Sequence, residues 1–227
     1  MLIKSALLTD ASGSIGGMTA SRNKGGLYLR SRVVPTNPNS SQQQTLRTAM
    51  SDLANRWNDT LTQAQRDDWD TYADNVTLPN ALGDQKNVSG IAMYIRSNVP
   101  RIQIGSPIVD AGPTVFNLGS FTEPVITATA PSSLSVVFLN SDLWANEDDS
   151  SMQIFASRGQ NPAIKYFKGP YRLAGTIAGD AGTPPTSPAA ITAPFVLTAG
   201  QIVFLKVNVT RADGRYASTF RGEDLVA

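Results

Sequence analysis

The run from Ser12 to Val76 constrains the fold of this chain most. In it, a glycine-rich segment is followed by a Pro-Asn segment and then by two stretches with periodic apolar residues. Residues 12–17 contain three glycines, which is too many for a helix or a central strand. Two later stretches suit strands: residues 18–22 and 27–33. The Asn-Lys-Gly-Gly segment between them suits a tight turn with positive φ. We therefore predict an extended arm with a basic β-hairpin over residues 1–34.

Basic side chains gather on this predicted hairpin. Alternate residues of a strand share a face, so Leu27, Leu29 and Val33 should lie opposite an arginine-bearing face. A two-stranded ribbon alone is marginal in water, so it must lie on the rest of the chain or on a neighbouring subunit. We expect contact with another protein, with contact to nucleic-acid phosphates as the weaker alternative. The candidate assembly residues are Arg22, Lys24, Tyr28, Arg30 and Arg32.

Helical patterns follow the Pro-Asn segment at residues 35–39. Ser40 or Ser41 can cap the first helix, and Thr62 with Gln65 forms a capping-box pattern for the second. A third helix would start after Ser89 and end before Pro100. The predicted helices cover about residues 41–57, 62–76 and 89–98. The apolar stripes of the first two, with one tryptophan each, should form a helical hub. Its candidate core residues are Leu46, Met50, Leu53, Trp57, Trp69 and Tyr72.

Three strings in this region carry a family resemblance. They are G-G-M-T-A-S-R-N-K-G-G-L-Y-L-R-S-R at 16–32, P-T-N-P-N-S-S-Q-Q-Q-T-L-R at 35–47 and W-N-D-T-L-T-Q-A-Q-R-D-D-W-D-T-Y-A at 57–73. In order and spacing this pattern resembles structural proteins of tailed bacteriophages and prophages, which share a glycine-rich arm, an R-x-R strand, P-x-N-P and L-T-x-x-Q-R-x-x-W-x-x-Y-A. The match covers about the first third of the chain.

The resemblance implies a virion component without a catalytic residue. We expect a capsid cement or decoration protein that assembles through its N-terminal arm, with a head-tail neck or tail protein as the alternative. Its partners would be other copies of itself and other virion proteins, such as the major capsid or portal and neck proteins. It would be located in the virion after assembly in the host cytoplasm.

The C-terminal half changes to a β pattern after a Gly- and Pro-rich linker at 101–122, which could add a strand near 114–118. Strands are predicted at 125–130, 133–140, 152–157, 165–173, 201–210 and 216–220, with an Asp-Gly turn before the last. Val203, Leu205, Val207 and Val209 should face a core. Residues 179–194 are low in complexity and predict a long loop. The fold class is therefore α+β. The parts are the arm (1–34), the hub (35–100), the linker (101–122) and an immunoglobulin- or fibronectin-like antiparallel β-sandwich (123–227).

Composition narrows the function further. The 227 residues include no cysteine and no histidine, which removes the thiol nucleophile, the commonest general base and the commonest metal ligand. A net charge of +1 gives no overall attraction to nucleic acid or membranes, and we expect neither as a partner. The charges are uneven, however, since a basic arm precedes an acidic helical pair. One subunit's arm could therefore fit the helices of the next, or both could be ordinary solvated faces.

Acidic and aromatic residues in the C-terminal half allow other types of site. Glu147-Asp148-Asp149 could hold a hard cation, but a solvated turn is the favoured interpretation because the spacing of a calcium loop is missing. We expect no cofactor, no metal and no enzyme activity; a glycoside hydrolase with paired carboxylates is the enzymatic alternative. A carbohydrate- or receptor-binding module, with loops around Trp144 and Tyr166–Tyr171 as its site, is the binding alternative.

Overall fold

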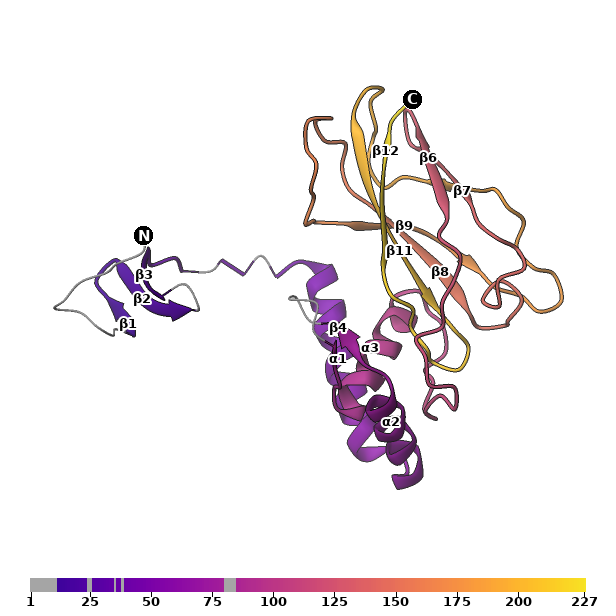
Figure 1. Cartoon of the computed structure of the whole chain (residues 1–227), viewed down its shortest axis with the longest axis horizontal. Helices are drawn as coiled ribbons and strands as arrows, with labels where there is room; N and C mark the ends of the chain where they lie inside the picture. The colour runs from indigo at the N-terminus through magenta and orange to yellow at the C-terminus, as the bar shows by residue number, and fades with distance from the viewer. Residues whose placement is uncertain (1–11, 24–25, 35, 38, 80–84) are drawn as a thin grey trace. The chain divides into compact units, whose positions relative to one another are not determined.

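The computed structural model describes residues 12–23, 26–34, 36–37, 39–79 and 85–227. The chain divides into two compact units, Met1–Gln43 and Gln44–Ala227. The second unit contains the helices, apart from the first three residues of the first one, together with the segment that follows them and the β-rich half. The described elements make a mixed α+β protein with antiparallel sheets, as the sequence predicted (Figure 1).

The smaller unit is a three-stranded antiparallel sheet in the order β1-β2-β3. Its strands are β1 (Gly13–Ile15), β2 (Met18–Asn23) and β3 (Gly26–Ser31). Gly16 begins the two-residue turn between β1 and β2 with φ 57°, a conformation that glycine adopts without steric cost. The glycine-rich segment was predicted to avoid a central strand, and β1 lies at the edge of the sheet.

Three helices form the first part of the larger unit: α1 (Ser41–Asp59), α2 (Gln63–Asn75) and α3 (Gly90–Gln103). The capping box of α2 is confirmed, since Gln65 N–H donates to Thr62 Oγ1 at 3.3 Å and Thr62 N–H donates to Gln65 Oε1 at 2.9 Å. The predicted end of the third helix at Asn98 was wrong. Although Pro100 lacks an N–H, α3 continues because the next residue, Arg101, is fixed by buried contacts.

The helices pack around an aromatic core. Trp69 lies edge-on to Tyr72 and Tyr94, with ring centroids 5.9 and 5.6 Å apart, and all three are fully buried. Leu53 is also fully buried, whereas Trp57 and Leu46 are half-buried. The prediction for Met50 was wrong, because its residue is 53% exposed. Ala49 and Leu53 form the buried stripe of α1. Met50 directly follows Ala49, so its side chain is turned away from that stripe.

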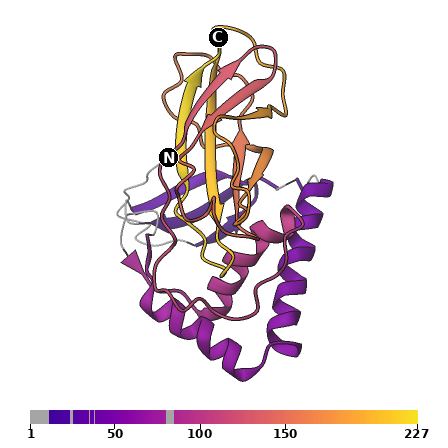
Figure 2. The same cartoon turned by 90° about the vertical axis from the view of Figure 1, so that its right-hand side faces the viewer.

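The β-rich half contains two larger antiparallel sheets. One has the order β10-β7-β6 and the other β12-β11-β8-β9. Their strands are β6 (Val125–Thr129), β7 (Ser133–Val137), β8 (Ser151–Ala156), β9 (Arg172–Ala178), β10 (Ala189–Thr192), β11 (Ile202–Thr210) and β12 (Phe220–Leu225). A short pair, β4 (Leu78–Pro79) and β5 (Gln85–Lys86), follows α2. Figures 1 and 2 both show the helices at one end of the larger unit and these two sheets at the other.

Residues from both sheets share one apolar core. The four predicted inward residues of β11 are all buried, which confirms their alternation. They belong to the same cluster as Leu134 and Val136 of β7 and Ile154 of β8. The other face of β11 is covered as well, since Ile202, Phe204 and Asn208 are also buried. A strand covered on both faces explains why its polar alternation was only partial in the sequence.

Several predicted strands were shifted or wrong. The stretch 165–173 is mostly a loop whose Phe167 packs on the sheet, and β9 begins only at Arg172. The tight turn at 211–215 is confirmed by an Arg211 N–H bond to the Arg215 carbonyl, but β12 begins at Phe220 instead of 216. Residues 114–118 form no strand. The predicted loop 179–194 contains β10, because β7 supplies a partner for a segment with little apolar pattern of its own.

Candidate interaction surfaces

The N-terminal sheet has one apolar face and one polar face. The register places Ile15 opposite Met18, and Ala20 opposite Leu29, on the apolar face. Ser14 and Thr19 are opposite each other on the polar face, where their hydroxyls lie 2.8 Å apart, and Arg30 follows on β3. The predicted two-sided pattern of the hairpin is therefore present, and a third strand extends it.

No described side chain of this unit is buried. Ile15 is 89% exposed, and Val34, just beyond the sheet, is 78% exposed. Burying apolar area contributes about 25 cal/mol per Å², so an apolar sheet face without a core beneath it is stabilised by covering it. In the described part of this unit, β1 and β3 each pair only with β2, which leaves each with an open edge.

The candidate assembly residues fall on this sheet or next to it. Tyr28 is half-buried, and Arg30 and Arg32 are exposed. Lys24 lies outside the described residues, and of Arg22 only the backbone is described, in β2. The structure thus brings Tyr28 and Arg30 onto the polar face of one strand, with Arg32 just past its end.

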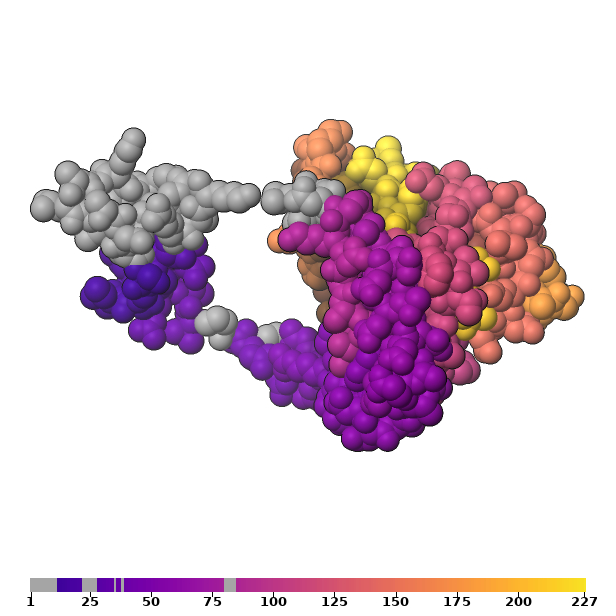
Figure 3. Space-filling view, turned by 60° about the horizontal axis from the view of Figure 1, so that its bottom comes forward, coloured from indigo at the N-terminus to yellow at the C-terminus, as the bar shows by residue number. Residues whose placement is uncertain are grey.

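An acidic surface lies on α2. Its exposed carboxylates are Asp67, Asp68, Asp70 and Asp74. Asp67 accepts a bond from Gln63 at 2.6 Å, and Asp70 accepts the N–H of Gly90 at 3.0 Å, which ties α2 to the start of α3. Asp68 and Asp74 make no such contact among the described residues. Figure 3 looks onto the helical end of the larger unit, where α1 and α2 form the surface in purple.

The helices are joined to the β-rich half by a buried arginine that the sequence did not single out. Arg101 is 1% exposed and donates to three backbone carbonyls. Its acceptors are Pro107 O at 2.6 Å, Arg211 O at 2.9 Å and Asp149 O at 3.1 Å. Burial lowers the pKa of this guanidinium. Gln153 adds a second link from β8, since its Nε2 donates to Pro100 O at 3.1 Å.

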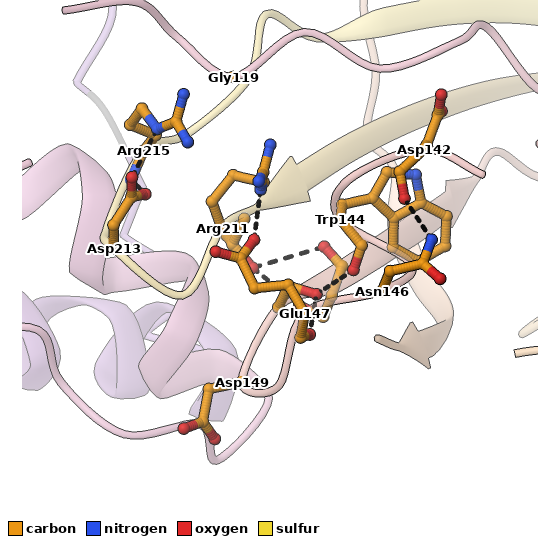
Figure 4. A network of polar contacts seen from close by, with 12 residues as sticks. Gly119, Asp142, Trp144, Asn146, Glu147, Asp149, Arg211, Asp213 and Arg215 are labelled. Carbon is orange, nitrogen blue, oxygen red and sulfur yellow. Dashed lines mark hydrogen bonds and ion pairs between the residues drawn. The ribbon is translucent and has the colours of Figure 1, made fainter. Parts of the chain in front are cut away.

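Charged pairs surround this joint (Figure 4). Glu147 points at Arg211, 2.5 Å away, and Asp213 points at Arg215, 2.6 Å away. Arg215 also donates to Asn117 Oδ1 at 2.7 Å. The acidic segment predicted either as a cation site or as a solvated turn is therefore part of the joint. Asp148, its middle residue, accepts the N–H of Ala181 at 2.9 Å. Among the described residues, no three acidic, histidine or cysteine side chains are grouped as metal ligands would be.

An aromatic pocket lies on the outer face of the four-stranded sheet. It has a volume of about 200 Å³, and its lining residues are Lys165, Tyr166, Phe167, Tyr171, Phe204, Arg221, Gly222 and Glu223. Tyr166 is 74% exposed. Trp144, which the sequence also placed in a binding site, is 1% exposed and packs on Phe138 inside the core, so that half of the prediction was wrong.

Comparisons with known proteins add little to this geometry. No family model and no curated protein matches the chain. One solved structure is similar, the crystal structure of a family 76 glycoside hydrolase from a bovine Bacteroides thetaiotaomicron strain, with 11% sequence identity and a TM-score of 0.31. The match covers 46% of this chain and 20% of the hydrolase. A likeness this low carries no argument about fold or activity. Within the described residues, no helix has the length and apolar character of a membrane span.

Proposed function

We propose that this chain is a non-enzymatic structural protein of a tailed-bacteriophage virion, acting as a capsid cement or decoration protein that self-associates through its N-terminal sheet. The observation that carries the proposal is that sheet. It is a compact unit with an apolar face, two open edges and no buried residue in its described part. The resemblance of residues 16–73 to virion proteins supplies the biological setting.

The mechanism is the covering of this sheet by a neighbouring subunit. Burial of the face formed by Ile15, Met18 and Leu29 provides apolar stabilisation, and an open edge can accept a further strand. Arg30 and Arg32 can then meet the carboxylates of α2 on the next copy, which fixes the orientation more than it adds affinity. A head-to-tail contact of this kind closes into a ring or extends over a capsid lattice.

The β-rich half completes the proposal as an immunoglobulin-like sandwich that projects from or reinforces the particle. Its support is the single apolar core to which both sheets contribute. The buried joint at Arg101 would keep this half fixed on the helices, so that a force on one is transmitted to the other.

The location in the virion is tested on purified particles. Mass spectrometry of density-purified virions from the lysed host should detect this chain at many copies per particle. Immunogold labelling should then mark the head. Label at the neck or tail would contradict the decoration role and favour the alternative, a neck or tail structural protein. A chain found only in the soluble lysate, and absent from the particles, would refute the virion proposal.

The arm contact is tested by charge exchange. Replacing Arg30 and Arg32 by Glu should weaken self-association, and adding Asp68→Lys and Asp74→Lys should restore part of it. The matched control is Glu123→Lys with Glu223→Lys, two exposed carboxylates of the β-rich half, which should restore nothing. Rescue by the control pair, or no effect of the first pair, would exclude docking of the arm on α2.

A further inference from the structure

The outer face of the four-stranded sheet is covered at two places, with the half-buried Phe155 and Lys206 between them. At one end, Gln153 of β8 contacts Pro100 of α3. At the other, the loop before β9 folds back so that the ring of Phe167 stacks on Phe204 of β11, with centroids 5.3 Å apart and planes 13° apart. The aromatic pocket lies beside this second cover.

The loop that forms the pocket wall is held in place by its own contacts. Tyr171 lies edge-on to Phe167, with ring centroids 5.3 Å apart, and its hydroxyl donates to the Phe167 carbonyl at 3.2 Å. Phe204 forms the floor and is 6% exposed. Tyr166 is left exposed at the rim, and among the described residues no ring–ring or cation–ring contact involves it. The aromatic surface is therefore preformed, with one free ring beside it.

Positive charge without a partner lies next to these rings. Lys206 of β11 is directly opposite Arg221 of β12 in the register, and like charges in this position repel. The Nζ of Lys206 lies over the ring of Phe155, 5.2 Å from the ring centroid. Burial and the neighbouring Arg221 lower the pKa of Lys206. No ion pair among the described residues involves either cation, and Lys165 adds a third at the pocket rim.

The pocket therefore combines an aromatic wall with excess cations. Its lining holds Lys165 and Arg221 against one carboxylate, Glu223. A volume of about 200 Å³ is below the roughly 300–1,000 Å³ of pockets for drug-sized ligands, so it suits a single ring. An anionic group on a bound ring would relieve the repulsion of Lys206 and Arg221, while Glu223 can accept hydrogen bonds from hydroxyl groups.

We propose that this pocket binds an acidic saccharide, with a pyranose ring against Tyr166 and Phe167 and its carboxylate at Arg221 and Lys165. The ring contact favours a sugar over an acidic peptide, because a carboxylated pyranose offers an apolar face and an anion on one rigid group. The site is built entirely from the larger unit. The saccharide site can therefore be tested independently of the assembly proposed for the N-terminal sheet.

The test is calorimetric titration of the full chain with tri-galacturonic acid, with neutral tri-galactose as the matched sugar. The acidic trimer should bind, and the neutral trimer should bind at least about tenfold more weakly, the effect expected for one charge-assisted contact. Tyr166→Ala and Arg221→Gln should each weaken the acidic trimer by roughly tenfold. Both side chains are exposed, so the fold is retained. Arg158→Gln, an exposed arginine over Phe195, is the matched control and should leave binding unchanged.

Three outcomes would overturn the proposal. Equal affinity for the acidic and neutral trimers would show that the carboxylate makes no contact with Arg221 and Lys165 that contributes to binding. Binding of tri-glutamate as tightly as tri-galacturonate, with no effect of Tyr166→Ala, would show a charged protein-contact surface instead of a sugar site. No heat of binding for either sugar at millimolar concentration would exclude a saccharide of this class.

Discussion

Replacing Arg101 by methionine should destabilise the larger unit more than any exposed substitution. The change removes three hydrogen bonds from a charged donor to backbone carbonyls, each contributing roughly 1.5–3 kcal/mol. The buried guanidinium also carries a desolvation cost of several kcal/mol, which its removal recovers. The bonds outweigh this recovery because methionine leaves the carbonyls of Pro107 and Asp149 without the donor that Arg101 provides, in a site closed to water. The Arg211 carbonyl keeps one donor, the N–H of Gly214 at 3.1 Å. We expect a net loss of about 3–5 kcal/mol.

The assay is urea unfolding followed by circular dichroism at 222 nm. A loss of this size is a large share of the 5–15 kcal/mol typical of a domain, so the midpoint should fall sharply. Arg101→Lys should fall between wild type and methionine, since an ammonium cannot reach three separated carbonyls in one plane. Arg158→Met serves as the exposed control and should change stability by less than about 1 kcal/mol. An Arg101→Met chain within 1 kcal/mol of wild type would refute the role of this clamp.

Three further predictions concern packing and burial. Gly112→Ala would place a Cβ 2.6 Å from a backbone atom of α2 and should cost about 1–3 kcal/mol, whereas Gly17→Ala meets nothing within 4 Å and should be near neutral; equal melting temperatures for the two would contradict this. In urea unfolding, Leu53→Ala should lower the unfolding free energy by about 2–5 kcal/mol and Met50→Ala by under about 1 kcal/mol. A comparable loss for Met50→Ala would show that Met50 is a core residue. Burial raises the pKa of Tyr72 to about 12 from 10.0, so the stability it contributes is complete below pH 10 and is lost as pH rises from 10 to 12. Tyr72 alone should therefore lower the unfolding free energy by on the order of 2–3 kcal/mol over that range. Burial also raises the pKa of Tyr216 to about 12 and the pKa of Tyr94 above its usual range, so the total fall in the wild type is larger. The fall should be smaller in Tyr72→Phe by the share of Tyr72, and an identical pH dependence in the two chains would count against it.

The local signals in the sequence predicted the helices well. The capping box at Thr62 and the 3.6-residue apolar period depend only on neighbours along the chain, and α1 and α2 follow them within two residues at each end. The end of α3 could not be predicted in this way. Its continuation past Pro100 depends on carbonyls at Asp149 and Arg211, which are remote in sequence.

The β-rich half was harder to predict, because its strands pair with partners that are distant in the sequence. β10 has little apolar pattern, and its partner in β7 is separated from it by two other strands in the chain. The aromatic residues near 165–171 were interpreted as a strand, although their rings cover a sheet formed by other segments. The same limit applies to the pocket. Tyr166 and Tyr171 were named from the sequence, but the Lys206–Arg221 pair exists only through the register of β11 with β12.

The two-sided character of the N-terminal sheet, in contrast, was predictable from alternation alone. Leu29 and Arg30 fall on opposite faces, as the period of two requires. The third strand was missed, because a glycine-rich segment carries no strand propensity and β1 forms only by pairing with β2.

The central claim is that this sheet is an assembly device, and the mass in solution tests it most directly. Light scattering of the full chain should give a defined multiple of 24.2 kDa. A chain lacking residues 1–34, and a full chain with Ile15, Val33 and Val34 changed to Ser, should be folded monomers. Val125, Leu143 and Val196 are also exposed apolar residues but lie in the larger unit, and changing them to Ser should leave the multiple unchanged. A monomeric full chain, or an oligomer that survives removal of residues 1–34, would contradict the account.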